Sequence, residues 1–183
     1  PHMQLSVSRL RAYMQCPMLY RWRYELGLEP EFTSADLVFG SAIHHAIAEF
    51  HGSSNTLDGL AMMSCFTDYW DAASANTNGL RFKTPEEELI QKAAAMCEAY
   101  VDRFRDVAAD ETELLFQIPL IDPASGAGDP AHSLNGCIDM VANGAIYEFK
   151  TSGRAHSQRD ADQSIQLTAY SLAYEYLYDQ PPK

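Results

Sequence analysis

The sequence predicts an α/β fold in which a mixed β-sheet is flanked by helices and the N-terminal half is helical. Apolar residues recur at helical spacing in several segments before residue 104, and from about residue 113 the pattern becomes that of strands. An Asn-Gly pair at residues 143–144 then marks a tight hairpin, and a last helix follows. This order of helices, three strands and a final helix fits one domain that spans residues 1–183.

The N-terminal half carries start and stop signals for helices. Residues 5–28 read as two short helices, with Ser6 as the N-cap of the first and Pro17 at the start of the second. Residues 37–52 have apolar side chains at helical spacing and end at a glycine, and residues 56–72 are weakly patterned but helical in composition.

Two further helices are expected. The first spans residues 84–104, with Thr84 as N-cap and a capping box that includes Glu87. The second runs from about 160 to 178 and has one apolar stripe, made of Ile165, Ala169, Leu172 and Tyr176. The chain stops soon afterwards, where sheets of this kind continue, so we expect a truncated chain or a disordered tail.

The strands lie between these two helices. Residues 113–121 read as a strand, residues 122–133 as a Gly/Pro/Ser-rich loop, and residues 134–150 as a hairpin. A type I′ turn at residues 143–144 would set Asp139 opposite Glu148, with their Cβ atoms roughly 5 Å apart. Lys150 would point to the same face, because strand side chains alternate.

Opposed carboxylates destabilise a strand pair unless something rewards them. A divalent cation between Asp139 and Glu148 would do so, and oxygen ligands suit Mg²⁺ or Mn²⁺. The alternative is a surface hairpin with solvated acids and a cross-strand ion pair.

Composition indicates a globular protein, with 46% hydrophobic and 21% charged residues. No apolar run reaches the roughly 20 residues of a membrane span, and no signal peptide is visible. The opening Pro-His-Met, residues 1–3, is read as a cloning remnant. Four cysteines without CxxC spacing predict reduced thiols in an intracellular, cytoplasmic protein.

The formal net charge of −12 disfavours nucleic-acid binding, but charge is segregated along the chain. Residues 1–24 hold four arginines and no acid, whereas the remainder holds nine basic residues against twenty-five acidic ones. The arginines alternate with aromatic residues, a combination that can bind a phosphate backbone. An amphipathic helix with arginine stems over apolar surface is the alternative.

Asp139, eight intervening residues and then Glu148, Phe149 and Lys150 form a short motif. Four other segments accompany it in a fixed order: the Cys-Pro segment 5–24, Gly40-x-x-x-His44, Gly136-x-x-Asp139 and Gln166-x-x-x-Tyr170. Together they resemble the PD-(D/E)XK nuclease superfamily, and within it the RecB-like branch of CRISPR-associated and phage exonucleases.

The resemblance implies a restriction-endonuclease-like core and a metal-dependent DNA nuclease. Asp139, Glu148 and Lys150 would be the catalytic residues, with Lys150 positioning the attacking water and helping to deprotonate it. Mg²⁺ or Mn²⁺ would supply Lewis acidity. The implied metal ligands are His44, Glu113, Asp139, Glu148 and the carbonyl of Phe149. His45 competes with His44, and Glu111 competes with Glu113.

The implied DNA contacts come from Gln166, Tyr170, Thr151, Arg9 and Arg21. Gln166 and Tyr170 are four residues apart and share a helix face, although Tyr170 also fits a core position. In many RecB-like relatives the cysteine of the Cys-Pro pair joins three C-terminal cysteines around an iron–sulfur cluster. This chain has no cysteine after residue 137, so we expect Cys16 to be a buried thiol and expect no cluster.

The leading interpretation is therefore an exonuclease that acts on DNA ends or single strands in recombination, repair or phage DNA metabolism, with a helicase or recombination partner and no membrane association. A catalytically silent DNA-binding or scaffold module with the nuclease fold is the main alternative. An enzyme acting on small phosphates is a third, but residues 125–128 make a poor phosphate loop.

Overall fold

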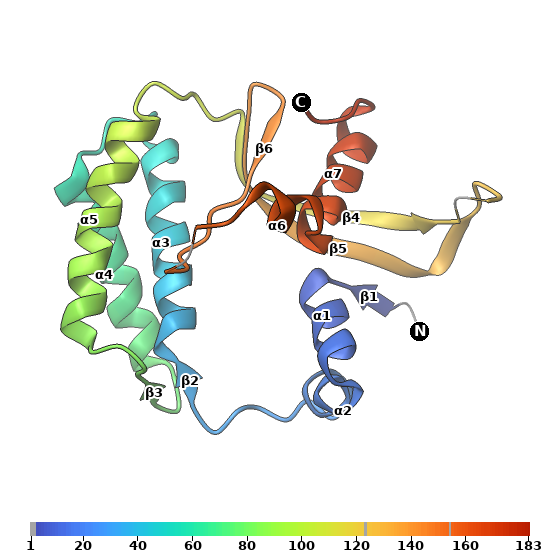
Figure 1. Ribbon diagram of the computed structural model, residues 1–183, viewed down its shortest axis with the longest axis horizontal. Coiled ribbons are helices and arrows are strands. Elements are labelled where there is room, and N and C mark those ends of the chain that lie inside the picture. Colours follow the sequence, from blue (N-terminus) through green and yellow to red (C-terminus); the bar gives the residue numbers. More distant parts are fainter. Residues whose placement is uncertain (1–2, 123, 154) are drawn as a thin grey trace. The chain divides into compact units, whose positions relative to one another are not determined.

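The computed structural model describes residues 3–122, 124–153 and 155–183, which fall into two compact units (Figure 1). The sheet unit holds the described parts of residues 1–29, 113–148 and 154–183, and the helical unit holds residues 30–112 and 149–153. Each unit has its own apolar core. Residues 1–2 of the expected cloning remnant and residue 123 of the expected loop lie outside the described residues. That the whole chain forms one domain stays a prediction.

Three long helices make the helical unit, and α4 packs against both of its neighbours (Figure 1). Their core is aromatic and aliphatic, with Phe39, Phe50 and Phe66 almost fully buried. Two very short strands, one before the first of these helices and one between the last two, pair in parallel. The elements are β2 (Thr33–Ser34), α3 (Ala35–Gly52), α4 (Gly59–Ala75), β3 (Leu80–Arg81) and α5 (Glu86–Phe104).

The predicted start of α5 is wrong by one position. Pro85, in an extended conformation, occupies the N-cap position and makes no side-chain capping bond, so Thr84 is not the cap. The carbonyl of Pro85 accepts hydrogen bonds from the amides of Glu88 and Leu89 and thereby begins the helix. In place of a capping box, the first turn carries three glutamates. Their negative charges interact favourably with the positive end of the helix dipole.

The sheet unit is organised around the long strand β5. Strand β1 pairs with β5 in parallel and β6 pairs with it antiparallel, so the sheet is mixed, as predicted. Strand β4 is the neighbour of β5 at the end of the strand order β1-β5-β4. The strands are β1 (Met3–Leu5), β4 (Glu111–Ile121), β5 (Gly128–Ala142) and β6 (Ala145–Tyr147).

Helices α1 and α7 pack on this sheet through a shared apolar core. Helix α1 (Val7–Gln15) begins as predicted, because the side chain of Ser6 accepts a hydrogen bond from the amide of Arg9. Pro17 starts α2 (Pro17–Tyr20), and a π-helix, η1 (Arg21–Glu25), follows directly. The α/β class and the helical N-terminal half are confirmed, whereas strand β1 was not predicted.

The single C-terminal helix predicted for residues 160–178 is in fact two helices. Helix α6 (Gln158–Asp162) ends before a break, and Ser164 then caps α7 (Ile165–Tyr178). The predicted stripe is also wrong, because Leu172 and Tyr176 are each 53% exposed. The buried face carries Ala169, Tyr170, Ala173 and Tyr174 instead. Apolar residues occur on every side of this segment, so periodicity alone could not select the face.

Gly136 has a packing role in the sheet that a substitution can test. A Cβ atom at this position would lie 2.6 Å from the ring of Phe116, a ring carbon too close for any real contact. We expect Gly136→Ala to lower the free energy of unfolding by about 1–3 kcal/mol, the usual cost of overpacking. Gly128→Ala is the matched control in the same strand, because nothing lies within 4 Å of its added Cβ. Equal denaturation midpoints for the two variants would contradict this account.

Candidate functional site

The hairpin that carries the acidic residues forms through the predicted turn. Asn143 and Gly144 both have positive φ, 52° and 77°, as a type I′ turn requires. The ladder pairs Ala142 with Ala145 and continues to its last pair, Met140 with Tyr147. Asp139, which precedes Met140, and Glu148, which follows Tyr147, therefore lie just beyond the last pair of the ladder.

The predicted strand was to continue to Lys150, and this is wrong because β6 ends at Tyr147. Glu148 is half-buried in the sheet unit, whereas residues 149–153 belong to the helical unit. The alternation of strand side chains therefore does not determine the direction of Lys150.

A second acid stands next to Asp139. Carboxylate oxygens of Glu113 and Asp139 lie within 4.8 Å of each other, and Asp139 is buried with 9% of its surface exposed. Glu113 also accepts a hydrogen bond from the Cys137 thiol at 3.3 Å. Its φ of 49° is in the left-handed region, which costs a non-glycine residue about 1–3 kcal/mol. Such strain is typical of functional sites. The structure thus places Glu113 beside Asp139, and a role for Glu113 in metal binding stays a prediction.

The electrostatics of this cluster are visible in the neighbouring groups. Burial, and after it the negative charges of Glu113, Asp139 and Glu148, raises the pKa of the Cys137 thiol to about 12. Burial likewise raises the pKa of the Tyr170 hydroxyl, and the negative charges of Glu148 and Asp139 raise it further. Three carboxylates thus concentrate negative charge around β5. This set of oxygen donors fits Mg²⁺ or Mn²⁺.

Helix α7 contributes a polar pair beside the same acids. The amide of Gln166 donates a hydrogen bond of 2.8 Å to the hydroxyl of Tyr170, as their spacing of four residues allows. Tyr170 itself is buried, and its ring packs edge-on against Phe116 with centroids 5.9 Å apart. Tyr170 is thus a core residue whose hydroxyl orients the half-buried Gln166.

His44 and the carbonyl of Phe149 meet inside the helical unit. The Nε2 atom of His44, on α3, lies 3.1 Å from the carbonyl oxygen of Phe149. The ring of Phe149 packs edge-on against Tyr100 and Phe104, with centroids 5.3 and 5.6 Å away. This aromatic contact holds the backbone so that the carbonyl faces the histidine. His45 instead lies against the ring of Tyr69, which favours His44 as the predicted ligand.

Lys92 anchors the same segment and was not predicted from the sequence. Its ammonium group donates a 2.8 Å hydrogen bond to the carbonyl oxygen of Thr151 and lies 5.1 Å from the centre of the Phe39 ring. The segment also runs close to α3, because a Cβ added at Gly40 would lie 3.5 Å from the Thr151 hydroxyl. This is an ordinary contact distance, so the packing does not require a glycine at position 40. Nothing in the sequence pattern separates Lys92 from a surface lysine.

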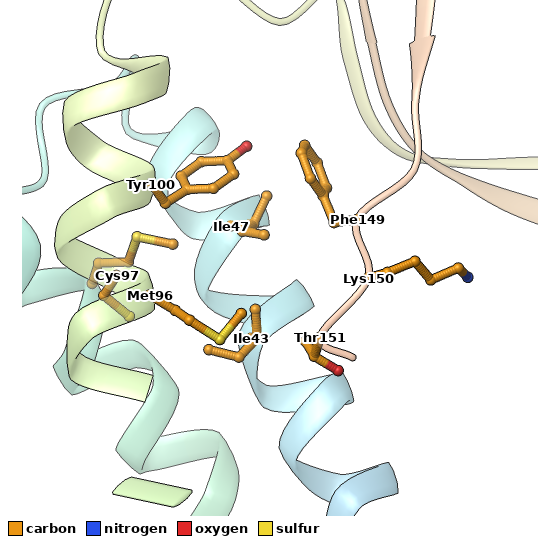
Figure 2. Close-up of a pocket in the computed structure, with 9 residues that line it drawn as sticks. Ile43, Ile47, Met96, Cys97, Tyr100, Phe149, Lys150 and Thr151 are labelled. Carbon is orange, nitrogen blue, oxygen red and sulfur yellow. The ribbon is translucent and has the colours of Figure 1, made fainter. Parts of the chain in front are cut away.

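An apolar pocket of about 110 Å³ lies between α3, α5 and residues 149–151 (Figure 2). Figure 2 shows Lys150 extending away from both helices, while Phe149 and Thr151 lie along them. Lys150 is exposed. Phe149 and Thr151, on either side of the lysine, are half-buried, whereas Lys150 is directed outward.

The N-terminal candidates differ in exposure. Arg21 is exposed and Arg9 is half-buried, with its guanidinium donating to the carbonyl of Gln4. Cys16 is exposed, so the prediction of a buried thiol is wrong. It lies between α1 and α2, where an extended backbone conformation interrupts the helix.

A family model of the PD-(D/E)XK nuclease superfamily matches residues 4–183, nearly the whole chain. The chain belongs to the PD-(D/E)XK nuclease superfamily. Membership indicates nuclease activity, that is, phosphodiester hydrolysis on a nucleic-acid substrate with a divalent metal. Comparison with curated proteins and with solved structures gave no match. None of the described helices combines the length and apolar character needed to cross a bilayer.

The anchoring role of Lys92 can be measured without any substrate. In Lys92→Met the apolar stem remains but the donor to Thr151 is lost, and a hydrogen bond from a charged group contributes about 1.5 kcal/mol at the low end of its range. We expect amide hydrogen exchange in residues 149–153 to accelerate about tenfold. Lys83→Met, which changes an exposed lysine in the same unit, is the control. Unchanged exchange in Lys92→Met would show that the segment is held by other contacts.

Proposed function

We propose that this chain is a metal-dependent deoxyribonuclease of the RecB-like branch, an exonuclease acting on DNA ends in recombination, repair or phage DNA metabolism. The observation that carries the proposal is the cluster of Glu113, Asp139 and Glu148 around β5 in a member of a nuclease superfamily. Buried or strained acids of like charge are costly unless a cation offsets them.

The proposed metal ligands are Asp139, Glu148 and Glu113, together with His44 and the carbonyl of Phe149. Phe149 directly follows Glu148 in the chain, so one peptide unit joins an acidic ligand to a carbonyl that faces His44. When bound, Mg²⁺ or Mn²⁺ would supply Lewis acidity toward the phosphodiester and lower the pKa of the attacking water.

Lys150 is the proposed catalytic lysine. Its side chain extends away from the helices of its own unit, and its ammonium group would hold the attacking water and offset negative charge in the transition state (Figure 2). The outward direction supports this role, because a lysine held in the helical core could not approach a substrate.

The proposed DNA contacts are Gln166, Thr151, Arg9 and Arg21, with Tyr170 supporting the Gln166 amide from the core. A helicase or recombination partner and a cytoplasmic setting, in a bacterium or encoded by a phage, are further parts of the proposal. They rest on the similarity to RecB-like exonucleases.

The central test is degradation of end-labelled linear single- and double-stranded DNA, beside a closed circle, with Mg²⁺, Mn²⁺ or EDTA. We expect metal-dependent loss of the linear substrates, which falls to the EDTA level in Glu148→Gln and in Asp139→Asn because each loses a ligand charge. Glu175→Gln, at an exposed position of α7, is the matched control and should cleave normally. DNA binding without cleavage in the parent would instead favour the silent binding module, and cleavage of the closed circle would exclude a strict exonuclease.

Lys150→Ala separates the lysine from the metal site. Loss of a residue that assists proton transfer lowers turnover by about 10²- to 10⁴-fold, while the midpoint of a Mg²⁺ titration should change little. Lys83→Ala serves as the charge-matched control. A titration midpoint that shifts in proportion to the rate would assign Lys150 to metal binding and not to the chemical step.

A further inference from the structure

The first helices of the sheet unit present aromatic and basic side chains that its core does not use. Only Val7 and Ala12 of α1 are buried, and α2 and η1 have no buried residue among those the structure describes. Their outward side chains form what we call the aromatic–arginine surface. It consists of Arg9, Arg11, Tyr13, Tyr20, Arg21, Trp22, Arg23 and Tyr24.

Three tyrosine rings of this surface form a connected row. Tyr13 and Tyr20 meet edge to face with centroids 5.6 Å apart, and Tyr20 lies 5.3 Å from Tyr24. The guanidinium groups of Arg9 and Arg23 then lie 4.9 and 5.6 Å from the centre of the Tyr24 ring. Contacts of this kind order aromatic and cationic groups before any ligand arrives.

Two aromatic members of this surface are more than half exposed. Tyr13 is 57% exposed and Trp22 is 51% exposed, and Met14 on α1 and Met18 on α2 are 69% and 47% exposed. Trp22 lies in a π-helix, a rare conformation that is frequent at functional sites. Large apolar groups gathered on a surface mark a place where something binds.

Charge selects the kind of ligand. Residues 1–24 hold four arginines and no acid in a chain whose net charge is −12. A polyanion is therefore attracted here and repelled by most of the remaining sequence. Open aromatic faces between arginines match single-stranded nucleic acid, whose bases expose faces that stack, whereas a duplex hides them.

We infer that the aromatic–arginine surface binds single-stranded DNA, with bases stacked on Trp22 and Tyr13 and phosphates contacted by Arg11 and Arg21. The inference rests on the proposed function for the nature of the strand and adds the element that receives it. Four arginines and two open rings suit a few nucleotides, so this surface holds the strand and contributes nothing to the chemical step.

The two tryptophans of the chain make the test direct. Trp22 is exposed, whereas Trp70 is 2% exposed and its indole donates to Glu86. Titration of oligothymidylate into the parent protein in EDTA should quench the fluorescence of Trp22 and leave that of Trp70. In Trp22→Phe the quenching should vanish while binding of a dye-labelled oligonucleotide persists.

Substitution then measures the contribution of each group. Trp22→Ala should weaken binding of the labelled oligonucleotide about 5- to 150-fold, the range for loss of one stacked base. Removing both Arg11 and Arg21 as alanines should reduce the slope of log affinity against log salt by about 1.4. Tyr176→Ala, at a position 53% exposed on α7, and Arg103→Ala, at an exposed position of α5, are the matched controls and should bind as the parent does.

The results of these experiments distinguish single-stranded DNA from other ligands of the aromatic–arginine surface. Unchanged affinity in Trp22→Ala, duplex binding that depends equally on Trp22, or Trp22 emission that responds to protein concentration and not to DNA would each overturn the inference, and the last would assign the surface to a second copy of the chain. All binding is measured without metal. Strand binding through Trp22 without cleavage in Mg²⁺ would therefore refute only the nuclease, and cleavage with no role for Trp22 would refute only this surface.

Discussion

The packing of Phe149 against Tyr100 and Phe104 is the contact on which the candidate site depends. Strand β6 ends at Tyr147, and this packing makes residues 149–153 part of the helical unit. Because the half-buried ring packs against these two aromatic side chains, the backbone carbonyl of Phe149 faces His44. The hydrogen bond from Lys92 to Thr151 secures the segment beyond it. Lys150, between these two anchors, is left exposed and directed outward (Figure 2).

The sheet unit holds several acidic side chains of like charge close together. Burial, and after it Glu113, Asp139 and Glu148, raises the pKa of the Cys137 thiol, and Glu113 adopts a backbone conformation that costs free energy. A bound divalent cation would offset this concentration of charge, and nucleases of the superfamily to which the chain belongs use one.

The distribution of charge gives a physical account of how such an acidic protein could act on DNA. Acids dominate the chain after residue 24, so attraction of a polyanion depends on the arginines of the first helices and on a cation at the carboxylates. The exposed rings of Tyr13 and Trp22 add a contact that salt does not screen. Affinity and catalysis would then be supplied by different elements.

By itself, the sequence determined the features that depend on neighbouring residues. Asn143-Gly144 specifies the turn and the register of the hairpin, Ser6 and Pro17 begin their helices, and motif spacing identifies Asp139, Glu148 and Lys150 as candidates. Tertiary structure decided what depends on distant partners. The three-residue strand β1 exists only by pairing with β5, Lys92 matters only because it reaches Thr151, and the buried face of α7 is selected by the sheet on which it packs. Local patterns cannot contain these results, since the free energy that decides each of them comes from residues far away in the chain.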